Sequence, residues 1–244
     1  MLIHIVFLFL LFSGNYVCAL DPNTIMREAD KIISDQAAIL TCDLLAKKPG
    51  QEDKRFRLKV WAKGKEKTLA KFLAPAKERG TGYLKNKENV WYYLPNIEKS
   101  IKVSGRQSLS GTDFSNSDIL GIDFLKDYTI RLMGEEKLNK TPCYLLDLKA
   151  KEGNITYDRI KCWVEKSNNM PLKFEYYTLS GELLKIMTLD QIKDLKGKIR
   201  PTRYTMDNRL LRGQQTIYDL VDIEYLENLS DNVFTIRYME KASE

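Results

Sequence analysis

Four aspartates gather in one short polar stretch, and they are the residues best placed to do chemistry: Asp113, Asp118, Asp123 and Asp127. A pair of carboxylates would suit a glycosidase, which needs an acid and a base or nucleophile. Several carboxylates in one loop would suit a calcium ion, but the regular Asp spacing and the closing glutamate of a calcium loop are absent. A turn at Asp113 and a helix start at Asp118 explain these side chains better. We therefore predict no catalytic residue, and a hydrolase using Asp113 is the weakest alternative.

Other catalytic and metal-binding groups are scarce. The chain has one histidine, His4, and neither a Gly-x-Ser-x-Gly nor a Cys-x-x-Cys motif, so serine hydrolase and zinc chemistry lack their side chains. Gly80 and Gly82 resemble part of a phosphate-binding loop, but no Gly-Lys-Ser/Thr follows them. We predict that the protein is not an enzyme and uses no metal and no cofactor.

The charge pattern excludes one class of partner. The net charge of +6 over 244 residues is modest and is spread along the chain. No block of lysine and arginine marks a nucleic-acid arm. We predict no nucleic-acid partner.

The N-terminus predicts export. Leu2 to Phe12 is apolar except for His4, and small residues follow, ending in Val17 and Ala19 at the −3 and −1 positions of a cleavage site. The run is too short for a bilayer-spanning helix, which needs about 20 residues. We expect residues 1–19 to be a cleaved signal peptide, residues 20–244 to form one domain, and the mature protein to reside in the periplasm. The alternative is a lipoprotein acylated and anchored at Cys18.

Three cysteines follow the expected cleavage site: Cys42, Cys143 and Cys162. Exported proteins can form disulfides, but an odd number leaves at least one thiol over. A hairpin turning at Gly153-Asn154 would place Cys143 diagonal to Cys162, or directly opposite after a shift of one residue. A Cys143–Cys162 disulfide is therefore one expectation, and two small buried thiols are the slightly favoured alternative.

The rest of the chain reads as strands with two helical pieces. Pro22 to Ser34 predicts an amphipathic helix with Ile25 and Ile32 on its apolar face. Asn116 to Lys126 breaks the strand pattern and predicts a short helix, with Ser117 as a candidate cap. Alternating segments of 5–10 residues predict about eleven strands. The tail, Val233 to Met239, is expected to be a last strand or an extended segment.

The fold follows from covering the apolar face of so many strands. A flat sheet would expose more apolar area than the few hundred Å² that a soluble monomer tolerates. We therefore expect a mainly β protein in which a single large curved antiparallel sheet forms an incomplete β-barrel with a helical lid. Two helices cover such a sheet thinly, which predicts an apolar ligand cavity. The candidate cavity and lid residues are Phe72, Trp91, Tyr93, Ile119, Leu120 and Phe124.

Several motifs resemble one known family. In order and spacing, four segments are similar to outer-membrane lipoprotein-sorting proteins with the LolA-like fold: Phe72 to Pro75, Arg79 to Leu84, Val90 to Pro95 and Leu109 to Asp118. Cys162 to Val164, Met170 to Lys173 and Phe234 to Glu240 add to the resemblance.

The resemblance implies a function as well as a fold. It implies a periplasmic carrier that binds lipid acyl chains or lipidated proteins and carries no catalytic residues. It also implies work beside an inner-membrane exporter of the resistance–nodulation–division type or a lipoprotein-release machinery, with peripheral membrane contact. The alternative is a sensor or adaptor that binds a partner protein, as RseB-like regulators do.

Overall fold

Alternating apolar and polar residues build the strands of this protein. In the computed structural model, which describes residues 21–241, Phe56, Leu58 and Val60 of one strand are buried while Arg55 and Arg57 between them are exposed. Such alternation makes one face of a sheet apolar. The strands are β1 (Ala37–Lys47), β2 (Lys54–Lys63), β3 (Lys67–Ala74), β4 (Gly82–Asn86), β5 (Asn89–Leu94), β6 (Lys99–Val103), β7 (Tyr128–Leu138), β8 (Thr141–Ala150), β9 (Arg159–Glu165), β10 (Pro171–Tyr177), β11 (Leu183–Leu195), β12 (Lys198–Asn208) and β13 (Gln215–Tyr225).

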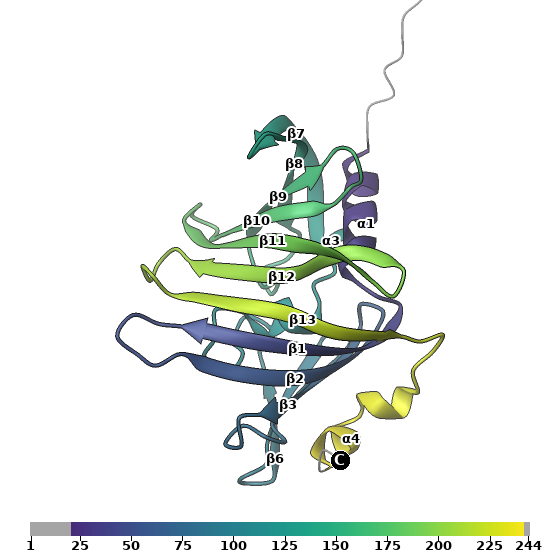
Figure 1. Ribbon diagram of the computed structural model, residues 1–244, viewed down its shortest axis with the longest axis vertical. Coiled ribbons are helices and arrows are strands. Elements are labelled where there is room, and N and C mark those ends of the chain that lie inside the picture. Colours follow the sequence, from purple (N-terminus) through teal and green to yellow (C-terminus); the bar gives the residue numbers. More distant parts are fainter. Residues whose placement is uncertain (1–20, 242–244) are drawn as a thin grey trace, which may run out of the picture.

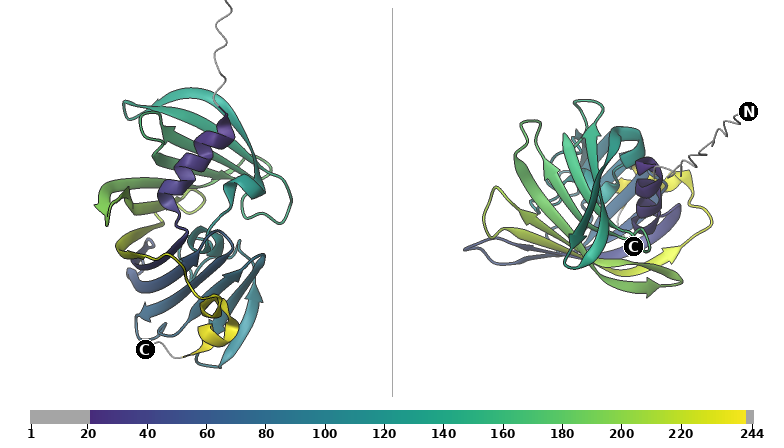
Figure 2. Two further views of the ribbon diagram at one scale, coloured as in Figure 1. Left: turned by 90° about the vertical axis from the view of Figure 1, so that its right-hand side faces the viewer. Right: turned by 90° about the horizontal axis from the view of Figure 1, so that it is seen from above.

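All thirteen strands form one antiparallel sheet (Figure 1). Its order is β6-β5-β4-β3-β2-β1-β13-β12-β11-β10-β9-β8-β7, so strands β6 and β7 are its two free edges. The sheet curves around an apolar core (Figure 2). The expected incomplete barrel is confirmed. The sheet has thirteen strands where about eleven were expected.

The first three helices lie against the concave face of the sheet. Helix α1 (Pro22–Ile33) begins at Asp21, whose carboxylate accepts from the backbone N–H groups of Asn23 and Thr24, each at 3.1 Å. Its buried residues, Ile25, Met26 and Ala29, belong to the main core. Helices α2 (Asn116–Leu120) and α3 (Phe124–Asp127) lie in the connection between the two edge strands.

No helix within residues 21–241 has the length and apolarity needed to cross a membrane. The expected signal peptide, residues 1–19, lies outside the described residues.

The C-terminal segment is helical rather than extended. It contains the 3-10 helix η1 (Asp231–Phe234) and helix α4 (Ile236–Glu240), so the expected last strand is wrong. The Ser230 and Thr235 side chains cap the two helices, which favours helical turns over a strand.

This segment covers the outer face of the sheet. Phe234 and Met239 are buried against Leu69, Leu84 and Tyr93. A Cβ atom at Gly82 would lie 2.6 Å from the Cγ of Met239, so only glycine leaves room for the segment here. The segment thus adds a second, smaller core on the convex side.

Candidate functional site

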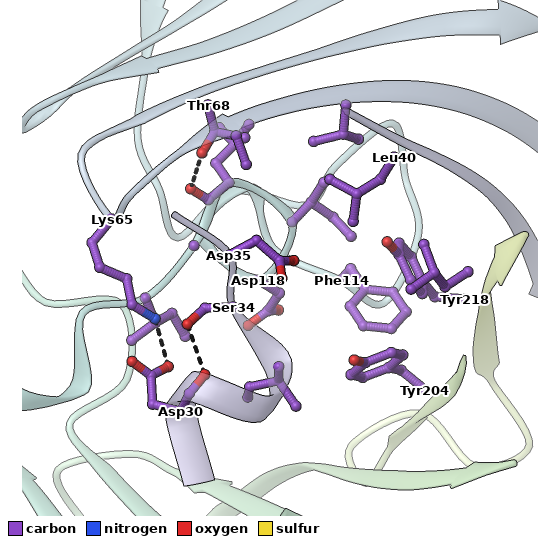
Figure 3. A pocket seen from close by; sticks show the side chains of 18 of the residues that line it. Asp30, Ser34, Asp35, Leu40, Lys65, Thr68, Phe114, Asp118, Tyr204 and Tyr218 are labelled. Atoms are coloured by element: carbon purple, nitrogen blue, oxygen red, sulfur yellow. Dashed lines mark hydrogen bonds and ion pairs between the residues drawn. The ribbon is translucent and has the colours of Figure 1, made fainter. Parts of the chain in front are cut away.

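A cavity of about 180 Å³ lies between the concave face of the sheet and the connection that carries α2 and α3 (Figure 3). Its walls are mostly apolar and aromatic. The wall residues from the sheet are Leu40, Val60, Ala62, Tyr176, Met187, Tyr204, Tyr218 and Leu220. Burial raises the pKa of both Tyr204 and Tyr218, so their phenols stay neutral at ordinary pH. The wall is therefore mostly apolar, and the charged lining residues are Asp30, Asp35, Lys65, Asp118 and Arg200.

The segment Ser115–Asp127, hereafter the lid, closes one side of the cavity. A capping box starts α2: Asp118 N–H donates to Ser115 Oγ at 3.2 Å, and Ser115 N–H donates to the Asp118 carboxylate at 2.7 Å. The cap of α2 is thus Ser115, whereas the sequence had predicted Ser117. Ile119, Leu120, Ile122 and Phe124 line the cavity.

The lid turns at Gly121 and is tied to the sheet by two side chains. Gly121 has φ 95°, a backbone conformation that favours glycine. Thr68 Oγ1 donates to the carbonyl of Leu120 at 2.9 Å, and Lys85 Nζ donates to the carbonyl of Gly121 at 2.6 Å. Burial lowers the pKa of Lys85, although nearby carboxylates oppose the shift. These bonds to two neighbouring carbonyls fix the bend between α2 and α3.

One polar rim of the cavity joins α1 to the β2–β3 turn. Lys65 Nζ lies 2.5 Å from Asp30 Oδ1, and the Ser34 hydroxyl donates to the Asp30 carbonyl at 2.7 Å (Figure 3). Burial raises the pKa of Asp30, and the Lys65 ammonium counteracts this. The last turn of α1 is thereby fastened over the cavity opening.

A buried arginine forms the other side of the rim. Arg200 on β12 is 2% exposed, and its Nη1 donates to both oxygens of Asp35, at 3.0 and 2.8 Å. Its Nη2 donates to the carbonyl of Ile33, the last residue of α1, at 3.0 Å. Lys198 Nζ donates to the same carboxylate at 2.8 Å. These contacts fix α1 to the start of β12.

Sequence reasoning missed Arg200. The strand begins at Lys198, three residues before the expected Pro201, and the sequence analysis gave Arg200 no role. The signal in the sequence was the spacing of two residues, which places Arg200, Thr202 and Tyr204 on the same face of the strand as the buried Met206.

Asp113 has a larger role than the expected turn. Its carboxylate accepts from Asn208 Nδ2 at 3.0 Å, Gln214 Nε2 at 2.7 Å and Thr216 Oγ1 at 2.8 Å. These donors lie on or beside the β12–β13 turn. The bonds place the neighbouring Phe114 in the cavity wall, so Asp113 positions the wall.

The structure brings together only part of the set expected from the sequence. Ile119, Leu120 and Phe124 line the cavity. Phe72 is fully buried in the same core but does not line the cavity, since it packs edge-on against Phe56 with ring centroids 5.5 Å apart. For α1, it is Ile33 rather than Ile25 or Ile32 that reaches the cavity.

Trp91 and Tyr93 were placed on the wrong face of the sheet. Both lie on the convex side, in the core formed with the C-terminal segment, while Val90 and Tyr92 face the main core. Alternation showed that the two pairs face opposite ways, but the sequence did not reveal that the convex side is also covered.

Cys143 and Cys162 are free buried thiols, as the slightly favoured alternative expected, so the Cys143–Cys162 disulfide is wrong for this structure. Cys143 pairs with Glu165, and Cys162 pairs with Leu146, which places the two cysteines on opposite faces of the sheet. Burial raises the pKa of Cys42, the third free thiol, to about 12, so it is an inert core residue.

The arrangement is suited to binding an apolar molecule. In the part of the chain that the structure describes, no three His, Cys, Asp or Glu side chains gather as metal ligands. The cavity has apolar walls and a charged rim, and this combination fits an amphiphile whose tail enters first.

Known proteins share this architecture. A family described as uncharacterized proteins matches residues 64–241. A LolA superfamily protein from Nitrosomonas europaea is 29% identical, with a TM-score of 0.83 over 90% of this chain and 100% of its own. A DUF1329 family protein from Desulfovibrio piger is 24% identical, with a TM-score of 0.81 over 89% and 97% of the two chains. A domain named as an outer membrane lipoprotein-sorting protein, from Vibrio parahaemolyticus, is 24% identical, with a TM-score of 0.79 over 90% and 98%. No curated protein matches the sequence.

Proposed function

This chain belongs to the family described as uncharacterized proteins and shares the LolA-like fold, and we propose that it is a periplasmic carrier of lipid acyl chains or acylated proteins. The observation that carries this proposal is the apolar cavity beneath a lid of two short helices. The donor would be an inner-membrane exporter or lipoprotein-release machinery.

The size of the cavity sets how a ligand would bind. Sites for small molecules usually measure roughly 300 Å³ or more. At about 180 Å³ the cavity is smaller, so a long acyl chain would enter only if the lid moved outward. The lid offers a bend at Gly121 and is tied to the sheet there by the Thr68 and Lys85 bonds.

The energetics explain why a carrier would use a lid. Burial of a methylene group contributes about 0.8 kcal/mol, so roughly 14 methylenes contribute around 11 kcal/mol before entropy costs. That is ample for binding and unfavourable for release. A lid whose Ile119, Leu120 and Phe124 refill the space as the chain leaves would lower the cost of release.

Fluorescent fatty acid binding tests the role of the lid. We expect Leu120→Glu and Phe124→Glu to weaken binding at least about tenfold, because a buried unpaired carboxylate disfavours an apolar ligand beside it. Both residues are buried, so Ile119→Glu, at a less buried lining position, is included in case they unfold the protein.

The matched control is Met133→Glu on β7, where the side chain is 55% exposed and far from the cavity lining. Circular dichroism verifies that the sheet is intact in each variant. Wild-type affinity in a folded Ile119→Glu and a folded Leu120→Glu would refute the proposed site.

A further inference from the structure

Three hairpin turns meet at one end of the sheet, and they form a surface that the cavity does not use. These are the β10–β11 turn (178–182), the β12–β13 turn (209–214) and the β1–β2 turn (48–53). The N–H of Arg209 donates to the carbonyl of Leu184 at 2.9 Å, which joins the first two. A Cβ at Gly213 would lie 3.1 Å from the Cγ of Pro49, which joins the second and third. Figure 1 shows them along one side of the molecule, at the left. We call this surface the turn surface.

The turn surface exposes large apolar side chains at its most prominent points. Leu179 is 83% exposed, Leu210 is 54% exposed and Leu211 is 56% exposed. Each lies in a turn and not on a strand face, so no neighbouring strand can cover it. An exposed leucine alone needs no explanation, but three on adjacent turns form a group.

Cations surround these leucines. Arg209 and Arg212 flank Leu210 and Leu211 directly in the chain. The same turns and their flanks carry Lys47, Lys48, Lys54 and Arg55, against Glu52, Asp53, Glu182 and Asp207. Within residues 21–241, none of these six cations forms an ion pair, whereas most other sheet-surface arginines do. The positive charge is therefore available to an external anion.

Much of the backbone of the β12–β13 turn is already hydrogen-bonded. Asn208 Oδ1 accepts from the N–H groups of Leu210 and Leu211, at 3.0 and 2.8 Å. Asn208 is itself held by Asp113, through its Nδ2 group at 3.0 Å. A turn whose N–H groups are paired can enter the headgroup region with a smaller desolvation cost, and it keeps its shape there.

We propose that the turn surface docks the protein on an anionic phospholipid bilayer, with the leucines inserted at the level of the headgroups and the cations paired with lipid phosphates. Shallow apolar insertion combined with basic residues is how peripheral proteins bind such surfaces. A protein partner would need about 800 Å² of closely packed interface on this side. Three leucines on two adjacent turns offer a small area of shallow insertion, which fits a fluid bilayer better. The docking is independent of what the cavity binds, so it stands or falls apart from the proposed function.

Vesicle co-sedimentation of the full chain tests the proposal. The vesicles contain either phosphatidylcholine alone or phosphatidylcholine with phosphatidylglycerol. We expect binding to the anionic vesicles that weakens as salt is raised, and weak binding to the neutral ones. Replacing Arg209 and Arg212 by glutamine is expected to reduce anionic-vesicle binding about fivefold per arginine.

The apolar part of the proposal is tested by Leu210→Glu/Leu211→Glu, for which we expect a loss of at least about tenfold. The matched control is Ile192→Glu/Ile199→Glu at the opposite end of the β11–β12 hairpin, where the side chains are 44% and 62% exposed. All variants have the same N-terminal segment, so differences in vesicle binding between them arise from the substituted residues. Absence of wild-type binding, equal binding to both vesicle types, or equal losses in the leucine and isoleucine variants would overturn the docking surface.

Discussion

Arg200 is the side chain on which the closure of the cavity rim most depends. It connects β12 to the end of α1 through Asp35 and the carbonyl of Ile33, and it is buried at 2% exposure. A buried cation is stabilised only while its partners remain in place. The polar contacts at the end of α1 therefore add to the apolar packing of its buried residues.

Arg200→Met is expected to lower the free energy of unfolding by about 3 kcal/mol, because Asp35 stays buried with only Lys198 beside it. Arg203→Met is the matched control. Arg203 lies on β12, like Arg200, and forms a two-pronged ion pair with Asp219 of β13, but both side chains are over one-third exposed. We expect the control to lose about 1 kcal/mol or less. Urea unfolding measures both, and equal losses would contradict the structural role of Arg200.

The C-terminal segment shows what an element gains from its caps. Its sequence alternates like a strand, yet Ser230 and Thr235 start helical turns, and the convex face of β3–β5 receives Phe234 and Met239. Asp231 fastens its start, since its two oxygens lie 2.8 Å from Lys63 Nζ and 2.9 Å from Lys67 Nζ.

Acid should release this segment. Hydrogen bonds from Lys63 and Lys67 lower the pKa of Asp231 from 3.8 to about 2. Because the folded pKa is the lower one, the contribution of Asp231 is fully present above its ordinary value and is lost as pH falls towards about 2. We expect Asp231→Asn to raise amide exchange in residues 231–241 at neutral pH, with the difference from wild type vanishing in acid.

The control for this experiment is Asp222→Asn, which removes an exposed carboxylate paired with Lys196 at 3.0 Å elsewhere on β13. Its amide exchange in residues 231–241 should match wild type throughout. A segment that exchanges equally fast in Asp231→Asn and in wild type at neutral pH would show that the lysine pair does not hold it.

For the molecule as a whole, one-sided alternation was enough to predict the curved open sheet and its lid. Strands such as β2 carry their apolar residues mainly on one face, and thirteen of them cannot lie flat in water. The lid residues Ile119, Leu120 and Phe124 were found because Asn116 to Lys126 breaks the strand period.

Register and outer-face packing were harder to predict. The β8–β9 connection runs from residue 151 to 158, which is too long for a two-residue turn to fix how the two strands pair. The pairing expected from a turn at Gly153-Asn154 therefore placed Cys143 near Cys162, whereas Cys143 pairs with Glu165. Within that connection the hydroxyl of Tyr157 donates to the Asp118 carboxylate of the lid at 2.7 Å, a contact between distant segments. Trp91 and Tyr93 were misplaced for the same reason, because their partners lie some 140 residues further along the chain, at Phe234 and Met239.

The central claim is that the cavity carries an acyl chain, and mass spectrometry of organic extracts tests it most directly. The protein is purified from a periplasm, extracted, and compared with Ile119→Glu and Leu120→Glu prepared in the same way. We expect an acylated lipid in the wild-type extract, near one molecule per chain, and a strong reduction in both variants. Lipid-free wild-type protein, or equal lipid in all three preparations, would contradict it.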